Sequence, residues 1–80
     1  MDLTLMDRIL KNNHDVIVTF TDEKRLRLKE NGIPVSIFDG DDVKAGWGTL
    51  ITEAGFVISR NGHHALYPWQ SVLRINYWKE

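Results

Sequence analysis

The segment "FVISRNGHHALYPWQSVLRINYW", residues 56–78, carries the clearest information about the fold. Asn61-Gly62 favours the positive φ angles of a type I′ β-hairpin turn, so we predict strands over "FVIS" and "HALYPW" on its two sides. The segment "PWQSV" is too short for a regular helix and predicts a single 3₁₀ turn. The run "LRINYW" then closes the chain as one more strand, so the whole stretch predicts an antiparallel β structure.

Three further short strands are expected earlier in the chain. Residues 15–20, "DVIVTF", are rich in β-branched side chains, which favour strands. Residues 25–29, "RLRLK", alternate between leucine and basic residues and predict a half-buried strand. A helix over 22–30 stays open as the alternative, because Glu, Lys, Arg and Leu are good helix formers. After the turn at Asn31-Gly32, residues 33–38, "IPVSIF", predict a strand whose proline suits a sheet edge or the strand's own start.

The remaining segments complete the expected order. Residues 39–46, "DGDDVKAG", predict a loop, and residues 47–52, "WGTLIT", predict a strand that reaches "FVIS" through a turn at 53–55. At the N-terminus, residues 2–12 predict a helix with Asp2 or Thr4 as its cap. Its apolar residues at helical spacing are Leu5, Met6, Ile9 and Leu10. So short a helix is not stable alone, and we expect it to pack on the sheet.

These elements predict one α+β domain over residues 1–80: an N-terminal helix packed on a small, strongly bent antiparallel β-sheet or barrel. The single 3₁₀ turn in "YPWQSVLRI" and the hairpin spacing resemble SH3-like and Sm-like barrels, which have such a turn before the last strand. The resemblance is architectural and implies no function, because the Sm-type RNA-binding signatures are absent. The expected core is Leu5, Ile9, Val16, Val18, Phe20, Leu26, Leu28, Val35, Ile37, Leu50, Phe56, Ile58, Leu66, Leu73 and Ile75.

Composition narrows the class of protein. The 80 residues are 42% hydrophobic and 26% charged, as expected of an ordered globular domain. The absence of cysteine excludes disulfides, thiolate metal sites and cysteine nucleophiles. A net charge of −1 disfavours a general binder of duplex DNA. No apolar run approaches the roughly 20 residues of a membrane span, and "MDLTLMDRIL" lacks the basic start of a signal peptide, so we expect a cytoplasmic location.

Two groups of residues are potential metal ligands. His63 and His64 are neighbours, and neighbouring residues on a strand point to opposite faces, so an exposed hairpin tip is the favoured interpretation; His14 is the one remaining histidine. The acidic residues of "DGDD" (39–42) do not fit a calcium-binding EF-hand loop, because its fifth position would be Val43. We therefore expect no bound metal and no cofactor.

Catalytic motifs are also lacking. The serines have no G-x-S-x-G context, and the glycines form no phosphate-binding loop that ends in Gly-Lys-Ser/Thr. A domain of this size has little room for a deep pocket. The sequence therefore predicts a protein that is not an enzyme.

Two binding functions remain. Arg25, Arg27 and Lys29 are expected to share one face of the predicted strand at 25–29, with Lys24 in the turn before it, and they could follow a phosphate backbone while aromatic rings stack on bases. These candidate nucleic-acid-binding residues are Lys24, Arg25, Arg27 and Lys29. Acidic Asp22, Glu23 and Glu30 flank them and weaken this single-stranded nucleic-acid hypothesis, which is the alternative.

The favoured hypothesis rests on the aromatic residues of the second half of the chain. The candidate partner-binding residues are Trp47, Tyr67, Trp69, Tyr77 and Trp78. Tyr77 and Trp78 are adjacent on a predicted strand, so one should face inward and the other outward. Exposed tryptophan and tyrosine are favoured at protein interfaces. We therefore expect a small non-catalytic module that binds a protein partner or itself, for example through an edge strand. The length suits a bacterial or phage accessory protein.

Overall fold

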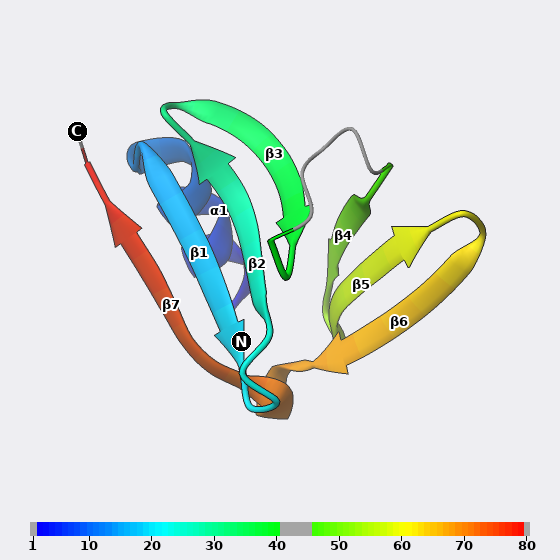
Figure 1. Cartoon of the computed structure of the whole chain (residues 1–80). Coiled ribbons are helices and arrows are strands. Elements are labelled where there is room, and N and C mark those ends of the chain that lie inside the picture. The colour runs from blue at the N-terminus through cyan, green and yellow to red at the C-terminus, as the bar shows by residue number, and fades with distance from the viewer. Residues whose placement is uncertain (1, 41–45, 80) are drawn as a thin grey trace.

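The computed structural model describes residues 2–40 and 46–79 and has an α+β fold with one N-terminal helix and two antiparallel sheets. The first sheet has four strands in the order β3-β2-β1-β7, and the second has three in the order β4-β5-β6 (Figure 1). The elements are α1 (Leu3–Asn12), β1 (Asp15–Phe20), β2 (Arg25–Glu30), β3 (Ile33–Phe38), β4 (Gly48–Thr52), β5 (Gly55–Arg60), β6 (His63–Pro68), the 3₁₀ turn η2 (Trp69–Ser71) and β7 (Val72–Trp78).

Local sequence signals account for most of these boundaries. Asn31 and Gly32 have φ angles of 50° and 80°, and Asn61 and Gly62 have 52° and 78°, as type I′ turns require. Residues 25–30 form a strand, so the helical alternative for this segment is wrong. The 3₁₀ turn before the last strand is confirmed. The α1 helix begins where Asp2 accepts a hydrogen bond from the Thr4 backbone N–H at 2.8 Å.

The described residues form two sheets and no closed barrel, so the barrel form of the prediction is not confirmed. Figure 1 shows the chain passing from β6 to β7 at the lower end, while β3 and β4 carry no shared strand pairing. A side-chain hydrogen bond links β3 to β4 instead, with the Ser36 and Thr49 hydroxyl oxygens 2.5 Å apart. Residues 41–45 of the predicted loop lie outside the described residues.

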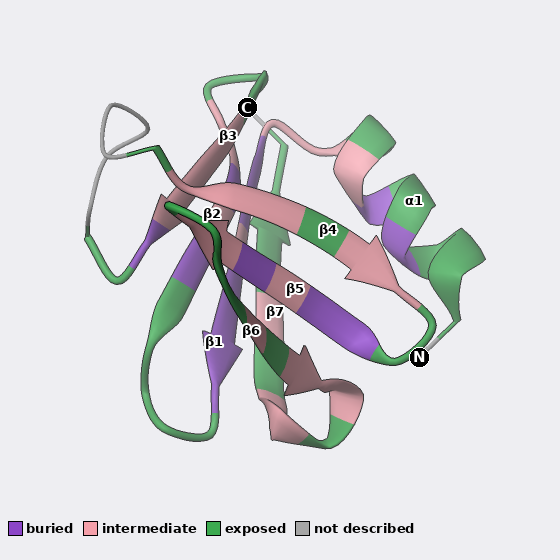
Figure 2. Cartoon of the chain, turned by 90° about the vertical axis from the view of Figure 1, so that its right-hand side faces the viewer, coloured by how far each residue is buried: buried purple, intermediate pink, exposed green. Residues whose placement is uncertain are grey.

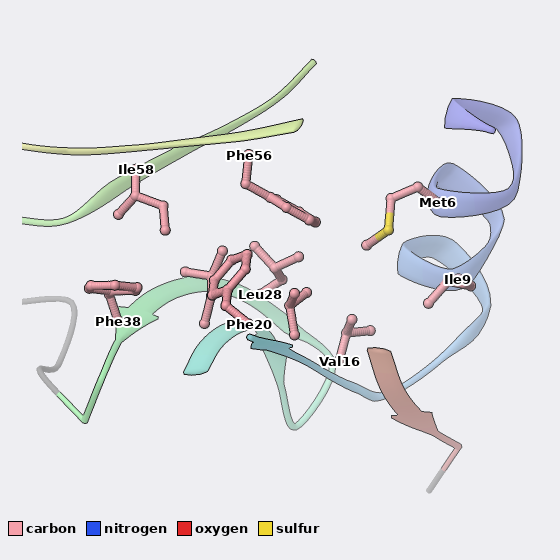
Figure 3. Close-up of a cluster of buried hydrophobic side chains, with 10 residues drawn as sticks. Met6, Ile9, Val16, Phe20, Leu28, Phe38, Phe56 and Ile58 are labelled. Atoms are coloured by element: carbon pink, nitrogen blue, oxygen red, sulfur yellow. The ribbon is translucent and has the colours of Figure 1, made fainter. Parts of the chain in front are cut away.

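The core fills the space between the two sheets and the helix. Met6 and Ile9 of α1 approach the cluster from one end, and Phe56 of β5 points toward it from the second sheet (Figure 3). The Phe20 ring of β1 lies edge-on to Phe56 at 5.9 Å between ring centres. The buried residues are Met6, Ile9, Val16, Val18, Phe20, Leu26, Leu28, Phe38, Phe56 and Ile58.

Four of the predicted core leucines are exposed, and the reason is strand register or helix orientation. Leu5, Leu50, Leu66 and Leu73 have exposed fractions of 48%, 62%, 54% and 55%. In α1, Met6 is buried in place of Leu5. In the second sheet Leu50 is paired with Val57, and Val57 with Leu66, so these three side chains share the outer face. Burial alternates along β5, where Phe56 and Ile58 face inward (Figure 2).

Leu73 is exposed for a different reason. The partner of Thr19 is Arg74 and the partner of Phe20 is Val72, so Leu73 is an extra residue in a bulge of β7. Val72 and Ile75 pack against the core on either side of it. The predicted core residues Val35 and Ile37 on β3 are half-buried.

Candidate functional site

Three of the five predicted partner-binding aromatics pack against the core instead of standing free on the surface. Trp47 lies edge-on to Phe38 at 5.1 Å between ring centres. Tyr67 stacks on Phe20 at 4.3 Å. Trp69 lies against Phe56 at 4.8 Å, and all three rings are partly buried. Their large rings close the gaps around a small core, which leaves them little surface for a partner.

The polar atoms of Tyr67 and Trp69 are also used within the chain. The Tyr67 hydroxyl donates to the Asp22 carboxylate at 3.1 Å. Burial, this hydrogen bond and the negative charges of Asp22 and Asp39 raise the pKa of Tyr67. The Trp69 indole N–H lies 2.9 Å from the Glu53 carbonyl oxygen and 3.2 Å from that of Thr52. Both rings therefore hold the turn regions in place.

Tyr77 and Trp78 are the two predicted aromatics that stay exposed. Their exposed fractions are 50% and 45%, so the exposed aromatic residue expected near the C-terminus is present, and the inward-facing ring is half exposed as well. Tyr77 is paired with Val16 and shares its core-side face, whereas Trp78 is paired with Asp15 on the outer face. Tyr77 remains half-exposed because β7 is the end strand of its sheet and has a neighbour on one side.

The outer edge of β7 is open. Within the part of the chain that the structure describes, β7 pairs with β1 and with no other strand, and Figure 1 shows its other side facing away from the molecule. The strand has seven residues, contains no proline and carries one charged side chain, Arg74. Leu73, Tyr77 and Trp78 add exposed apolar surface along it. A long edge strand of this kind can pair with another chain.

The four predicted nucleic-acid-binding cations do not form one ribbon. The Lys24 ammonium lies 5.8 Å from the centre of the Phe38 ring. The Lys29 ammonium donates to the Leu10 carbonyl oxygen of α1 at 2.6 Å, so it points toward the helix. The prediction that Arg25, Arg27 and Lys29 share a face is therefore wrong. The physical reason is the register shift in the β1–β2 pairing, where Val16 is opposite Lys29 but Ile17 is opposite Arg27.

A different basic group forms on the outer face of the four-stranded sheet. Thr19 of β1 is paired with Arg25 on one side and with Arg74 on the other. Arg27 lies in the next row, beside Ile17. Sequence reasoning missed Arg74, because only the β1–β7 pairing brings it next to Arg25.

Acidic groups moderate the charge of this face. The Arg27 guanidinium is 3.8 Å from the Asp15 carboxylate and 3.5 Å from that of Glu30. A hollow of about 460 Å³ on this face is lined by Arg25 and Arg27 but also by Glu23 and Asp39. The outer face is therefore mixed in charge, with Arg74 and Arg25 as its most exposed cations.

Asp15 is a buried carboxylate at the start of β1, with an exposed fraction of 7%. It accepts hydrogen bonds from the Asn31 backbone N–H at 3.2 Å and pairs with the His14 ring nitrogen at 3.1 Å. Burial opposes its ionisation, but these hydrogen bonds and the positive charges of His14 and Arg27 outweigh burial and lower the pKa of Asp15. The group joins β1 to the β2–β3 turn and has a structural role.

His63 and His64 begin β6 and are exposed, as predicted for the hairpin end. The His64 ring nitrogen lies 2.6 Å from the Ser59 hydroxyl oxygen across the hairpin. Among the described residues, no three His, Cys, Asp or Glu side chains lie close enough to hold a metal ion. Asp41 and Asp42 of the acidic loop lie outside the described residues.

Comparisons with known proteins identify no relative, so the candidate site is assigned from the structure of this chain. No protein family, curated protein or solved structure matches the chain. No helix in the described part of the chain is long and apolar enough to cross a membrane. The β7 edge with Tyr77 and Trp78 is the best-defined candidate site.

Proposed function

We propose that this protein is a non-catalytic binding module that contacts another protein chain through the open edge of β7. The observation that carries the proposal is the combination of an open seven-residue edge strand with two half-exposed aromatic residues, Tyr77 and Trp78. Backbone groups at the edge would supply hydrogen bonds to an added strand, and the two rings would supply apolar contact. Tryptophan and tyrosine are the residue types that most often dominate interface energy.

The two rings would contact different faces of a partner strand. Tyr77 shares the core-side face with Val16, and Trp78 shares the outer face with Asp15. A strand added beside β7 would therefore meet one aromatic ring on each face, which fixes its register as well as its position. We further propose the SH3-like or Sm-like relationship, since η2 directly precedes β7, and a role as a cytoplasmic accessory protein of a bacterium or phage.

The test uses the parent chain and the double variant Tyr77→Ser/Trp78→Ser as affinity baits in extracts. A protein captured by the parent is purified and its affinity for both baits is measured by calorimetry. We expect at least a tenfold loss for the double variant, about 1.4 kcal/mol or more. The matched control is Leu50→Ser/Leu66→Ser, which removes similarly exposed side chains from the other sheet. Equal binding by the parent and by Tyr77→Ser/Trp78→Ser, or a parent that neither captures a protein nor self-associates, would contradict the proposal.

A second candidate function is binding of single-stranded nucleic acid on the outer face of the four-stranded sheet. The observation that favours it is that Arg25 and Arg74 flank Thr19 on this face, which also carries Trp78. Arginine and stacking aromatics are the usual components of such a surface. The acidic neighbours of Arg27 and the net charge of −1 make it the weaker candidate.

The two candidates differ in their dependence on salt. A phosphate-driven contact weakens steeply as salt rises, because binding releases counterions from the nucleic acid. A titration of tryptophan fluorescence with a mixed-sequence oligonucleotide at low and moderate salt separates them. We expect weak binding that Arg25→Glu/Arg74→Glu does not change. Tight, salt-sensitive binding that this variant abolishes would promote the nucleic-acid function.

A further inference from the structure

We infer that the hollow on the outer face of the four-stranded sheet binds a short zwitterionic peptide with apolar side chains. The hollow has a volume of about 460 Å³, which lies within the usual range for small-molecule sites. In Figure 1, α1 lies behind β1 and β2, so this face of the sheet is turned toward the viewer. No residue of β7 lines the hollow, so the inference goes beyond the proposed function. The lining side chains are Ile17, Glu23, Arg25, Arg27, Ile37 and Asp39.

The hollow carries charges of both signs. Glu23 lies in the turn before β2 and Asp39 directly follows β3, so the two carboxylates belong to one end of the β2–β3 pair. Arg25 and Arg27 follow from that end along β2. The carboxylates repel a polyanion, and the guanidinium groups repel a metal cation. The arrangement therefore favours a molecule with an ammonium group at one end and a carboxylate at the other.

Three of these four charged side chains are available to a ligand. Within the described part of the chain, the side chains of Glu23, Arg25 and Asp39 form no ion pair or hydrogen bond, whereas Arg27 is already paired with two carboxylates. A guanidinium can donate two parallel hydrogen bonds to a carboxylate, so Arg25 is the main candidate for that end of the ligand. Glu23 and Asp39 would hold the ammonium end.

The backbone at Glu23 supports a role for its carboxylate. Its φ angle is 71°, in the left-handed region where glycine is unstrained and glutamate is uncommon. The Glu23 backbone N–H donates to the Phe20 carbonyl oxygen at 2.9 Å, so the turn holds this conformation. Strained backbone of this kind is characteristic of functional sites. Glycine would suit the turn better, and what the glutamate adds is a carboxylate in the hollow.

The hollow also has an apolar part. Ile17 is paired with Arg27, and Arg27 with Ile37, so the two isoleucines lie on either side of one arginine. Both are half-buried and leave apolar surface for the side chains of a ligand. An extended dipeptide spans about 7 Å. One two-residue step along β2, from the acidic end toward the arginines, has the same length. A dipeptide with aliphatic side chains therefore matches the hollow in charge, polarity and length.

The first test is an NMR titration of the full chain with L-leucyl-L-leucine. We expect saturable shifts of the backbone amide signals of the lining residues, with a dissociation constant of about 1 mM or tighter. N-acetyl-L-leucyl-L-leucine lacks the ammonium group and L-leucyl-L-leucine amide lacks the carboxylate, so each should bind at least about fivefold more weakly. No saturable binding of the free dipeptide, or equal binding of an end-blocked form, would overturn the inference.

Paired changes of protein and ligand assign each end of the dipeptide to a residue. Arg25→Gln should weaken binding of the free dipeptide at least about fivefold and have little effect on the amide, which has no carboxylate to lose. Glu23→Gln should do the same for the free dipeptide and the acetylated form. Arg74→Gln is the control, because Arg74 is on the same face and does not line the hollow. An equal loss for Arg74→Gln would show a general effect of charge and overturn the inference.

Glu23→Gly separates the carboxylate from the turn. Removal of the backbone strain should raise the melting temperature by about 4 °C. The affinity for L-leucyl-L-leucine should fall as it does for Glu23→Gln, although the fold is more stable. A more stable variant that binds the dipeptide like the parent would overturn the inference.

The last variant separates the hollow from the β7 edge. Tyr77→Ser/Trp78→Ser should leave dipeptide binding unchanged, because neither ring lines the hollow. Loss of dipeptide binding in this variant would place the peptide at the β7 edge and overturn the inference. A parent chain that captures no protein and does not self-associate, but binds the dipeptide in the hollow, would contradict the proposed function and support this inference.

Discussion

The two edges of the four-stranded sheet, β3 and β7, differ in how they are protected. β3 carries Pro34 near its start and is tied to the second sheet by the hydrogen bond between Ser36 and Thr49. β7 has no proline, and within the described residues its outer side meets no strand. Its exposed side chains include Tyr77 and Trp78, whereas β3 ends in the buried Phe38. One sheet thus has a protected edge and an open one.

The difference shows that edge protection is a local property of each strand and not of the sheet. A proline removes a backbone donor, and a neighbouring layer covers what remains. β7 has neither protection, although it shares β1 and β2 with β3 and the same core behind them. An edge left open on an otherwise protected sheet is the reason to assign function to β7.

The largest expected effect comes from Gly55 of β5, which packs against the end of β6, where the chain turns toward β7. Gly55 has a φ angle of 145°, and a Cβ placed on it would lie 2.1 Å from the Tyr67 carbonyl oxygen and 2.7 Å from the Pro68 Cα. Gly55→Ala should therefore cost about 3 kcal/mol of unfolding free energy or more, from backbone strain and overpacking together. Urea denaturation measures this loss of stability. We expect the change to displace β7 as well, and so to remove the contrast between the β3 and β7 edges.

The matched control for this variant is Gly62→Ala in the β5–β6 turn. Gly62 has a φ angle of 78°, but a Cβ there would meet no atom within 4 Å. We expect a loss of about 1 kcal/mol, from the left-handed backbone alone. Similar losses of stability at Gly55 and Gly62 would show that the close packing of β5 against the end of β6 adds nothing to the need for glycine at position 55.

A second prediction concerns Asp15, which lies on β1 between the two edges. Its pKa in the folded chain is lowered from the ordinary value of 3.8, so its contribution to stability is present above that value and is lost as the pH falls through the lower folded pKa. Asp15→Asn should be less stable than the parent at neutral pH, and the gap should narrow below pH 3.8. Urea denaturation as a function of pH measures the gap.

The control for Asp15 is Asp7→Asn in α1. The Asp7 carboxylate forms an exposed ion pair with Lys11 at 2.9 Å. Exposed pairs contribute little, so this variant should stay close to the parent across the same pH range. A gap for Asp15→Asn that does not change with pH would contradict the assigned role of its carboxylate.

A third prediction concerns Pro34, whose replacement would open the protected edge of β3. Pro34→Thr restores a backbone N–H and a β-branched side chain at the second residue of β3. The change in unfolding free energy should stay within about 1 kcal/mol, because Pro34 is exposed and lies at an edge. We expect increased self-association above that of the parent, measured by light scattering. An unchanged association state would show that Pro34 is not what protects β3.

The smallest effect is expected away from both edges. His63→Ala/His64→Ala changes two exposed side chains at the start of β6 and removes the contact between His64 and Ser59. The unfolding free energy should change by no more than about 0.5 kcal/mol, since surface changes of this kind are nearly neutral. Addition of Zn²⁺ should not alter the melting temperature of the parent. A zinc-dependent rise that the double variant lacks would reopen the metal hypothesis.

Most of the helix, strands and turns could be predicted from the sequence. The Asn31-Gly32 and Asn61-Gly62 turns and the 3₁₀ segment depend on residues that are close in the chain, so short-range patterns were sufficient. The alternation in "RLRLK" favoured a strand but left a helix over 22–30 open, and the structure has a strand at 25–30. The same patterns predicted that an exposed aromatic residue would lie at the end of the last strand. They could not show that both Tyr77 and Trp78 are exposed.

Which of these residues share a surface depends on the tertiary structure. The bulge in the β1–β2 pairing turned Lys29 toward α1, and the β1–β7 pairing placed Arg74 next to Arg25 across Thr19. The packing of Trp47, Tyr67 and Trp69 around the core left Tyr77 and Trp78 as the exposed pair. The physical reason is that a strand's neighbours and register are set by contacts between distant parts of the chain, and a shift of one residue moves a side chain to the other face.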